Sequence, residues 1–360
     1  MSRARDIADL SSVSARLDTL GASEGALSNR NLIINGAMQV AQRGTQTNST
    51  NAYTACDRWE FIEGGSSVIT SSQDSDSPQG FANSVKLDVT TASGTPSSAD
   101  YAILRTKFEG QDLQNLQYGT SSAKPLTLSF WVKSAKTGTH YVEAVHTDAS
   151  YYTNSIVYTI NSADTWEQKS ITFSGYQTTG FDNDNANSFQ IYFWLMTGSD
   201  YGGGTHTTNT WHNTTANRVV GQVNVMDSTS NNFYVTGVQL EIGEKATAFE
   251  HEPYERTLSK CLRYYQKHVG WITQFNRGLD SNYDAHVVNN GVGVVGFMRA
   301  TPTETIDNVY RWDAGDSDWT SDSTAFSAAI SSSSQTFVEG YYGRQSCNAV
   351  KADWELIAEL

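Results

Sequence analysis

Tryptophan side chains beside carboxylates are the residues of this 360-residue chain best suited to do chemistry. The stretch RWDAGDSDW contains Trp312, Asp313 and Trp319, with two further aspartates between the tryptophans. An indole ring can stack on the apolar face of a sugar ring, and a carboxylate accepts hydrogen bonds from sugar hydroxyl groups. Further aromatic candidates in the same part of the chain are Trp271, Tyr341 and Tyr342. These residues are candidates for binding a saccharide, and the alternative is that they fill a small core or an oligomer axis.

Two segments with alternating apolar residues carry aromatic side chains on their other face. In LTLSFWVKS, residues 126–134, this face includes Trp131, and in FQIYFWLM, residues 189–196, it includes Tyr192 and Trp194. If the two strands are neighbours, these rings form a platform suited to stacking on sugars. The alternative is that a loop, a helix or another subunit covers them.

A long polar segment, residues 198–218, is rich in glycine and carries Tyr201, Trp211 and two histidines. Loops of more than about 12 to 15 residues are uncommon and are often functional. We therefore expect one of two roles for this segment. Either Tyr201 and Trp211 contact a ligand, or the segment is an elaborate turn at the edge of the fold.

Catalysis and metal binding find little support in the sequence. The stretch FDNDNANS, residues 181–188, has the acidic spacing of a calcium loop but lacks its glycine and distal glutamate, so we expect a turn stabilised by Asn and Asp. The serine-hydrolase, zinc-protease and P-loop motifs are absent. We predict no catalytic residue, no metal and no cofactor. The enzymatic alternative is a polysaccharide depolymerase that uses two of the 38 acidic residues.

The composition is typical of an extracellular β protein, with 38% hydrophobic residues, 17% charged residues and many Ser, Thr, Asn and Gly. A net charge of −14 argues against a nucleic-acid partner, because such a surface repels phosphate. Cys56, Cys261 and Cys347 are widely spaced, which favours neither disulfides nor a zinc site and indicates folding in a reducing cytoplasm. We find neither a signal peptide nor an apolar run long enough for membrane insertion. Together these features favour a virion protein made in the host cytoplasm.

The elements that must position the candidate residues are β-strands. Alternation with Gly, Asn and Ser turns predicts an all-β protein with a jelly-roll β-sandwich over residues 31–250, whose first strand is NLIINGAMQVAQRGT. Residues 251–267 have helical apolar spacing and predict a connector helix. Residues 268–360 predict a smaller C-terminal β domain, the tip. For residues 233–243, the expected core face is Tyr234, Val238, Leu240 and Ile242.

Residues 1–30 have the pattern of a short N-terminal helix that anchors or oligomerises the chain. The spacing of Leu10, Val13, Leu17 and Leu20 matches a coiled-coil seam. Fewer than three heptads do not hold a coiled coil alone. We therefore expect either a seam between subunits or a helix that packs on its own chain.

Several phrases together resemble one known family. They are NLIINGAMQVAQRGT with CDRWEF, LTLSFWVKS, TWEQKSITFSG, FYVTGVQLEIGEKATAFEHEPY and LSKCLRYYQK, which span residues 31–267. In these phrases the chain resembles bacteriophage tail-fibre and related virion appendage proteins, whose central domain is similar to a carbohydrate-binding-module jelly roll. The resemblance implies an appendage, often trimeric, that touches the host surface. Such modules often place acidic calcium ligands near the first phrase, but no carboxylate occurs between Asn31 and Gln39, so we expect no calcium there.

The sequence therefore predicts a non-enzymatic virion protein, a tail fibre or receptor-binding adhesin that contacts host-surface glycan. Its expected partners are sister subunits in a trimer, other virion proteins through the N-terminus, and host polysaccharide. One alternative is a purely structural head fibre or tail adaptor. The other is the capsule or envelope polysaccharide depolymerase.

Overall fold

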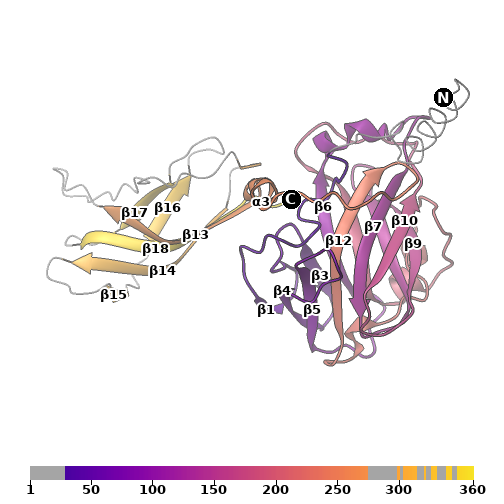
Figure 1. The fold of residues 1–360 in the computed structure, drawn as a ribbon, viewed down its shortest axis with the longest axis horizontal. Helices are drawn as coiled ribbons and strands as arrows, with labels where there is room; N and C mark the ends of the chain where they lie inside the picture. Colours follow the sequence, from indigo (N-terminus) through magenta and orange to yellow (C-terminus); the bar gives the residue numbers. More distant parts are fainter. Residues whose placement is uncertain are drawn as a thin grey trace, which may run out of the picture. The chain divides into compact units, whose positions relative to one another are not determined.

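The computed structural model describes residues 29–274, 298–300, 303–313, 320–321, 326–330, 338–342 and 347–360. These residues fall into two compact units, divided between Pro253 and Tyr254, whose elements are shown in Figure 1. The predicted seam of Leu10, Val13, Leu17 and Leu20 lies outside the described residues. None of the helices in the described part is long and apolar enough to span a membrane.

The first unit is a jelly-roll β-sandwich of two six-stranded antiparallel sheets, as the sequence predicted. The first sheet, here the β12 sheet, contains in spatial order β1 (Gln46–Ser49), β4 (Val68–Asp74), β5 (Ser84–Thr91), β12 (Asn232–Ile242), β7 (Leu126–Ser134) and β10 (Glu167–Phe173). The second, here the β11 sheet, contains β2 (Ala52–Tyr53), β3 (Glu60–Gly64), β6 (Tyr101–Glu109), β11 (Asn187–Thr197), β8 (Gly138–His146) and β9 (Tyr152–Ile160). Short helical turns are η1 (Gly110–Asp112), η2 (Gln114–Leu116), α2 (Ser199–Gly202), η3 (Thr215–Asn217) and η4 (Val225–Asp227).

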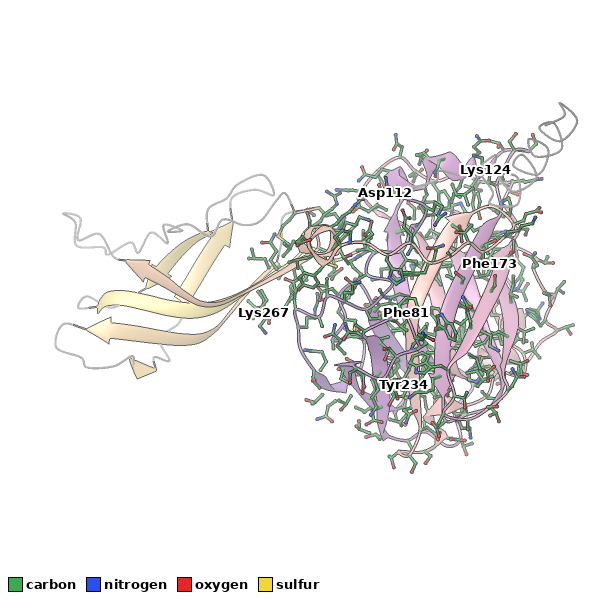
Figure 2. The ribbon with its side chains drawn as sticks, viewed as in Figure 1. Phe81, Asp112, Lys124, Phe173, Tyr234 and Lys267 are labelled. Atoms are coloured by element: carbon green, nitrogen blue, oxygen red, sulfur yellow. The ribbon has the colours of Figure 1, made fainter. Side chains whose placement is uncertain are left out.

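The predicted alternation is confirmed in β7 and is partly wrong in β11 and β12. In β11 it holds up to Leu195, but the register shifts between Trp194 and Met196, and Met196 is buried in the core as well. In β12 the expected core residues Val238 and Leu240 are buried in the core, but Tyr234 lies on the outer face. The register shifts between Thr236 and Gln239, where Gly237 has a φ of 60° and reverses the alternation. A Cβ at Gly237 would also lie 2.6 Å from the ring of Phe81. Figure 2 labels Phe81 and Tyr234, and it shows how densely side chains cover this sheet.

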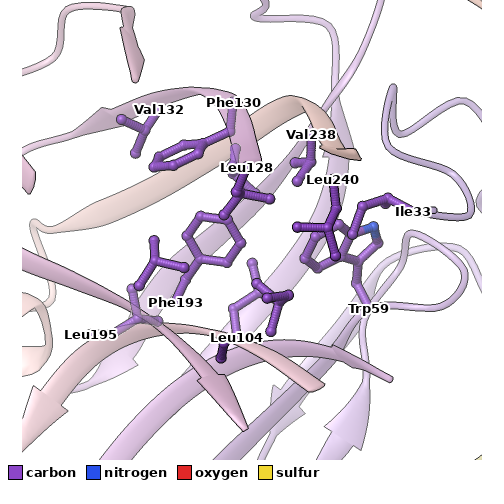
Figure 3. Close-up of a cluster of buried hydrophobic side chains, with 14 of the residues drawn as sticks. Ile33, Trp59, Leu104, Leu128, Phe130, Val132, Phe193, Leu195, Val238 and Leu240 are labelled. Carbon is purple, nitrogen blue, oxygen red and sulfur yellow. The ribbon is translucent and has the colours of Figure 1, made fainter. Parts of the chain in front are cut away.

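The core between the two sheets is built on aromatic rings. Phe130 of β7 and Phe193 of β11 meet edge to face with their centroids 5.0 Å apart, and Trp59 lies 6.1 Å from Phe193. All three side chains are fully buried, and Figure 3 shows them among the aliphatic residues of both sheets. Edge-to-face rings add to the stabilisation from apolar burial. This contact therefore fixes the two sheets relative to each other, and with them the two outer faces.

The stretch NLIINGAMQVAQRGT was predicted to be the first strand, and this is wrong, because the first strand of the structure begins at Gln46. Asn35 adopts a φ of 61° and turns the chain, a conformation that Asn tolerates better than most residues. Its side-chain amide donates to the carbonyl of Val40 at 2.9 Å and accepts from the amide of Val40 at 3.0 Å. A side chain that bonds its own backbone in this way competes with strand pairing.

The second unit begins with α3 (Tyr254–Leu262), and β13 follows from Tyr265, so the end of the expected 251–267 helix is strand. Its four-stranded sheet has the order β13 (Tyr265–Gln274), β18 (Cys347–Ile357), β14 (Thr303–Asp313) and β15 (Thr320–Ser321). A separate pair consists of β16 (Phe326–Ile330) and β17 (Val338–Tyr342). The described part of residues 268–360 is therefore β-structured.

His140 of β8 is a fully buried titratable group in the sandwich core. Its Nε2–H donates to the carbonyl of Lys136 at 3.1 Å, and its ring stacks on Tyr158 with centroids 5.5 Å apart. Burial lowers the pKa of His140 from 6.5 to about 4. The unfolded chain therefore binds a proton at His140 more readily than the folded protein does. As a result, protonation of His140 does not reduce the free energy of unfolding above about pH 6.5, and it reduces it progressively as the pH falls from there toward 4.

We predict that His140→Gln flattens the acid side of the stability profile. From the lowered pKa, His140 removes about 2 kcal/mol of unfolding free energy between pH 7 and pH 5. Urea unfolding at both pH values measures this difference in each protein. Equal losses in the wild type and in His140→Gln would contradict the assignment.

Candidate functional site

The aromatic candidates on strands lie on opposite sides of the sandwich. Trp131 is on β7 in the β12 sheet, whereas Tyr192 and Trp194 are on β11 in the β11 sheet. The single platform predicted from the three rings is therefore wrong. The outward side of Trp131, Tyr192 and Trp194 on their strands was predicted correctly, but the two strands are not neighbours in one sheet.

On the β11 sheet, Tyr192 and Trp194 are buried beneath residues 198–223, here called the strap. Arg218 of the strap places its guanidinium carbon 5.0 Å from the centroid of Trp194 and 5.9 Å from that of Tyr192. The same guanidinium donates to both carboxylate oxygens of Glu143, at 2.8 and 2.6 Å. The indole N–H of Trp194 donates to Glu143 as well, at 2.9 Å. The protein thus covers these rings with its own cation, which is the alternative that the sequence left open.

The two aromatic residues of the strap are also engaged within the protein. Trp211 donates its Nε1–H to the carbonyl of Ser174 at 2.7 Å and packs 5.3 Å from the ring of Tyr176. Tyr201 packs 5.6 Å from the ring of Trp194. Both side chains are half-buried. Both rings therefore pack within the protein, where the segment covers the outer face of the β11 sheet.

The outer face of the β12 sheet carries a similar arrangement, in which a cation packs against aromatic rings and pairs with a carboxylate. The ammonium of Lys133 lies 4.0 Å from the ring centroid of Tyr234 and 5.6 Å from that of Trp166. Asp76 accepts from this ammonium and, at 2.8 Å, from the indole N–H of Trp166. The hydrogen bond from Lys133 and then that from Trp166 hold the pKa of Asp76 below its usual value. On this sheet too, a cationic side chain of the protein, that of Lys133, covers the aromatic rings.

Trp131 differs from every other tryptophan whose side chain is described. Like Trp166 and Trp211 it is partly buried, but in the described structure it makes no side-chain hydrogen bond, ring contact or cation contact. In the sheet it lies between Gln168 of β10 and Thr236 of β12. The other described indoles all donate an Nε1 hydrogen bond: Trp59, Trp166, Trp194 and Trp211.

The surroundings of Trp131 offer hydrogen bonds but little net charge. Gln168 and Ser170 are exposed on the adjacent edge strand, and an amide and a hydroxyl can each donate and accept. Lys133, two residues along β7, is already paired with Asp76. A partly exposed indole with a polar, charge-balanced rim can stack on the apolar face of a neutral sugar, and the rim can hold the sugar hydroxyl groups.

Sequence reasoning identified most of the rings but missed the groups that occupy them. Arg218 and Glu143 are far from Trp194 in the chain, and only the fold brings them together. Lys133 carried a usable signal, because residues two apart on a strand share a face and Trp131 is two residues away. Gln168 and Asp76 had no such signal.

The candidate residues of the C-terminal unit are placed only on the backbone. Trp271 is on β13, Trp312 and Asp313 are on β14, and Tyr341 and Tyr342 are on β17. Trp319 lies outside the described residues. Their role in binding stays a prediction.

The Asn- and Asp-rich stretch at residues 181–188 makes turn contacts. Asp184 accepts from the amide of Ala186 at 2.9 Å, which is the bond of an Asx turn. The amide of Asp182 donates to the carboxylate of Asp148 at 3.0 Å. Across the described ranges, no three His, Cys, Asp or Glu side chains gather into a group that could hold a metal ion.

Comparison with known proteins gives fold-level similarity only. No protein-family model and no curated protein matches the chain. Among solved structures, the tailspike protein 4 enzymatically active domain of bacteriophage CBA120 matches at 16% identity and a TM-score of 0.33. That match covers 59% of this chain and 21% of the tailspike chain, so the chain spans about a fifth of that protein.

Two further matches cover nearly whole chains of the other protein. A putative sugar-binding protein from Bacteroides thetaiotaomicron matches at 13% identity and a TM-score of 0.32, over 59% of this chain and 100% of that one. A family 11 carbohydrate-binding module from Clostridium thermocellum matches at 17% identity and a TM-score of 0.27, over 58% and 98%. Because these TM-scores lie below 0.5, any function proposed for this chain rests on its own residues.

We predict that Arg218→Ala destabilises the sandwich by about 3–5 kcal/mol, because it leaves the buried carboxylate of Glu143 without its cationic partner and with only the indole N–H of Trp194 as a side-chain donor. The matched control is Lys136→Ala, which breaks the half-exposed pair with Asp227 and costs less than about 1 kcal/mol. Denaturant unfolding of both variants measures the two costs. Similar losses of unfolding free energy in the two variants would show that the ion pair of Arg218 does not hold the strap on the sheet.

Proposed function

We propose that this protein is a non-enzymatic virion appendage protein that binds a neutral host-surface saccharide through the face around Trp131. The observation that carries the proposal is the partly exposed indole of Trp131, which lies on a sheet held by the sandwich core and makes no contact with another ring or cation in the described part. The neighbouring rings are occupied by Lys133. A sugar ring would cover the indole of Trp131, as Lys133 covers the rings of Tyr234 and Trp166.

The chemistry of the face favours a neutral sugar bound weakly at each site. Stacking on one indole with a few hydrogen bonds from Gln168 and Ser170 gives low affinity, and several copies presented together raise it by multivalency. The net charge of −14 disfavours polyanionic ligands. A homotrimer, as the family resemblance implies, would supply the required copies.

The place of the protein in a particle also belongs to the proposal. We propose that residues 1–30 attach it to its sister subunits and to other virion proteins, and that it is made in the host cytoplasm and carried on the tail or another appendage. The support is the resemblance of residues 31–267 to tail-fibre proteins, together with the Ser-, Thr- and Asn-rich composition. Binding of nucleic acid and insertion into a membrane form no part of the proposed role.

We predict that Trp131→Ala weakens retention of the full chain on host-envelope polysaccharide by about tenfold or more, because it removes the stacking surface. Trp131→Phe keeps an aromatic ring and should lose less. An array of bacterial surface glycans, read with both variants and the wild type, measures this. Because most of the Trp131 side chain is buried, Trp131→Ala should also lower the melting temperature, so retention is compared at a temperature where every variant is folded.

Three other outcomes would overturn the proposal. Equal retention of Trp131→Ala and wild type would remove the face from the binding site. Silence of the wild type on every glycan, with a changed oligomeric state in Trp131→Ala, would show that the ring packs between subunits. Release of reducing ends from the polysaccharide would indicate a depolymerase.

A further inference from the structure

The two ends of the sandwich meet at one carboxylate. Glu250, near the end of the first unit, accepts hydrogen bonds from the backbone amides of Asn29 at 2.6 Å, Arg30 at 2.6 Å and Asn31 at 3.0 Å. The guanidinium of Arg30 also donates to the carbonyl of Ala248 at 3.2 Å. We call this set of bonds the Glu250 clamp. It joins segments that are more than 200 residues apart in the chain.

The incoming side of the clamp is fixed to β12. The amide of Leu32 donates to the carbonyl of Leu240 at 2.9 Å, and the amide of Leu240 donates to the side-chain oxygen of Asn31 at 3.0 Å. Asn31 also donates to the carbonyl of Val238 at 3.1 Å. Residues 29–31 therefore meet Glu250 just before the backbone bond from Leu32 to β12.

The outgoing side is fixed to the same strand. After β12 the chain folds back, and Thr247 donates twice to the carboxylate of Glu241, from its amide at 2.8 Å and from its hydroxyl at 2.7 Å. The amide of Glu250 then donates to the side-chain oxygen of Gln239 at 2.7 Å. Gln239 and Glu241 are buried, although they lie on the face of β12 that the sequence pattern marks as polar. Their role is thus to hold the returning chain.

The clamp is made of charge-assisted bonds. Burial alone would raise the pKa of Glu250, but the amides of Asn31, Asn29 and Arg30, with the charge of Arg30, hold it below its usual value. Hydrogen bonds to an ionised carboxylate are about twice as strong as neutral ones. Three of them on one side chain make a strong cross-link between two adjacent chain segments.

We infer that the Glu250 clamp carries tension past the sandwich. A pull between the residues before Asn29 and those after Pro253 reaches the amides and the carboxylate of the clamp first. The chain between them, residues 32–249, forms a closed loop that bears no tension while the clamp holds. The sandwich then lies outside the segment that bears the tension, and the face around Trp131 keeps its geometry while the chain is pulled. This function does not depend on whether that face binds a glycan.

The test is single-molecule stretching of the full chain, held by its two ends at constant tension. We expect the sandwich of Glu250→Gln to open about tenfold or more faster than that of the wild type, because the variant lacks the charged acceptor. The matched control is Glu244→Gln, which removes an exposed carboxylate from the same outgoing segment and should open at the wild-type rate.

A second pulling geometry separates tension transfer from ordinary stability. With handles at the exposed positions Gln79 and Ser162, the load enters the sandwich directly and does not cross the clamp. In this geometry Glu250→Gln should open at nearly the wild-type rate. An equal acceleration in both geometries would mean that Glu250 only stabilises the fold, and an unchanged rate in the end-to-end pull would mean that the clamp carries no tension. Either result overturns the inference.

Discussion

An aromatic ring that points outward from a β-sheet must be covered, and this constraint organises both faces of the sandwich. On the β11 sheet the cover is the strap, and the guanidinium of Arg218 packs against the rings of Tyr192 and Trp194. On the β12 sheet the ammonium of Lys133 does the same for Tyr234 and Trp166. A carboxylate neutralises each cation, so neither face presents an unpaired buried charge. Among the described tryptophans, only Trp131 has neither a side-chain hydrogen bond nor a ring or cation contact, and this is why it is the best candidate for a ligand.

The positions of these groups follow from the core and from the chain ends. The edge-to-face contact of Phe130 with Phe193 locks the two sheets together, so each outward side chain has a fixed place. The Glu250 clamp then closes the chain at the point where it enters and leaves the sandwich. A rigid face on a closed module is suited to holding a weak ligand repeatedly, because little ordering is needed on binding.

Much of the fold could be predicted from the sequence, because apolar alternation directly reports which face of a strand is buried. The pattern placed Phe130 and Phe193 in the core correctly and Trp131 outside it. It failed at Tyr234, because a bulge at Gly237 shifts the alternation, although an isolated glycine within a strand pattern is itself a signal for a bulge. It failed again at Asn31–Thr45, where local side-chain bonds replace strand pairing.

The candidate site was harder to predict, because strand neighbours are set by topology. Nothing in the segments around Trp131 and Trp194 says that they belong to different sheets. The groups that cover the rings come from distant segments, as Arg218 does for Tyr192 and Lys133 does for Tyr234. The composition indicates a polar surface with few charges. Which aromatic ring remains uncovered is determined by contacts between residues that are far apart in the chain.

The most direct measurement follows the indole N–H signals of the full chain by NMR during titration with a neutral host-surface oligosaccharide. The signal of Trp131 should shift progressively, while those of Trp59, Trp166, Trp194 and Trp211 stay in place, because their N–H groups are already bonded within the protein. An unmoved Trp131 signal beside shifts at other tryptophans would contradict the assignment of the binding face.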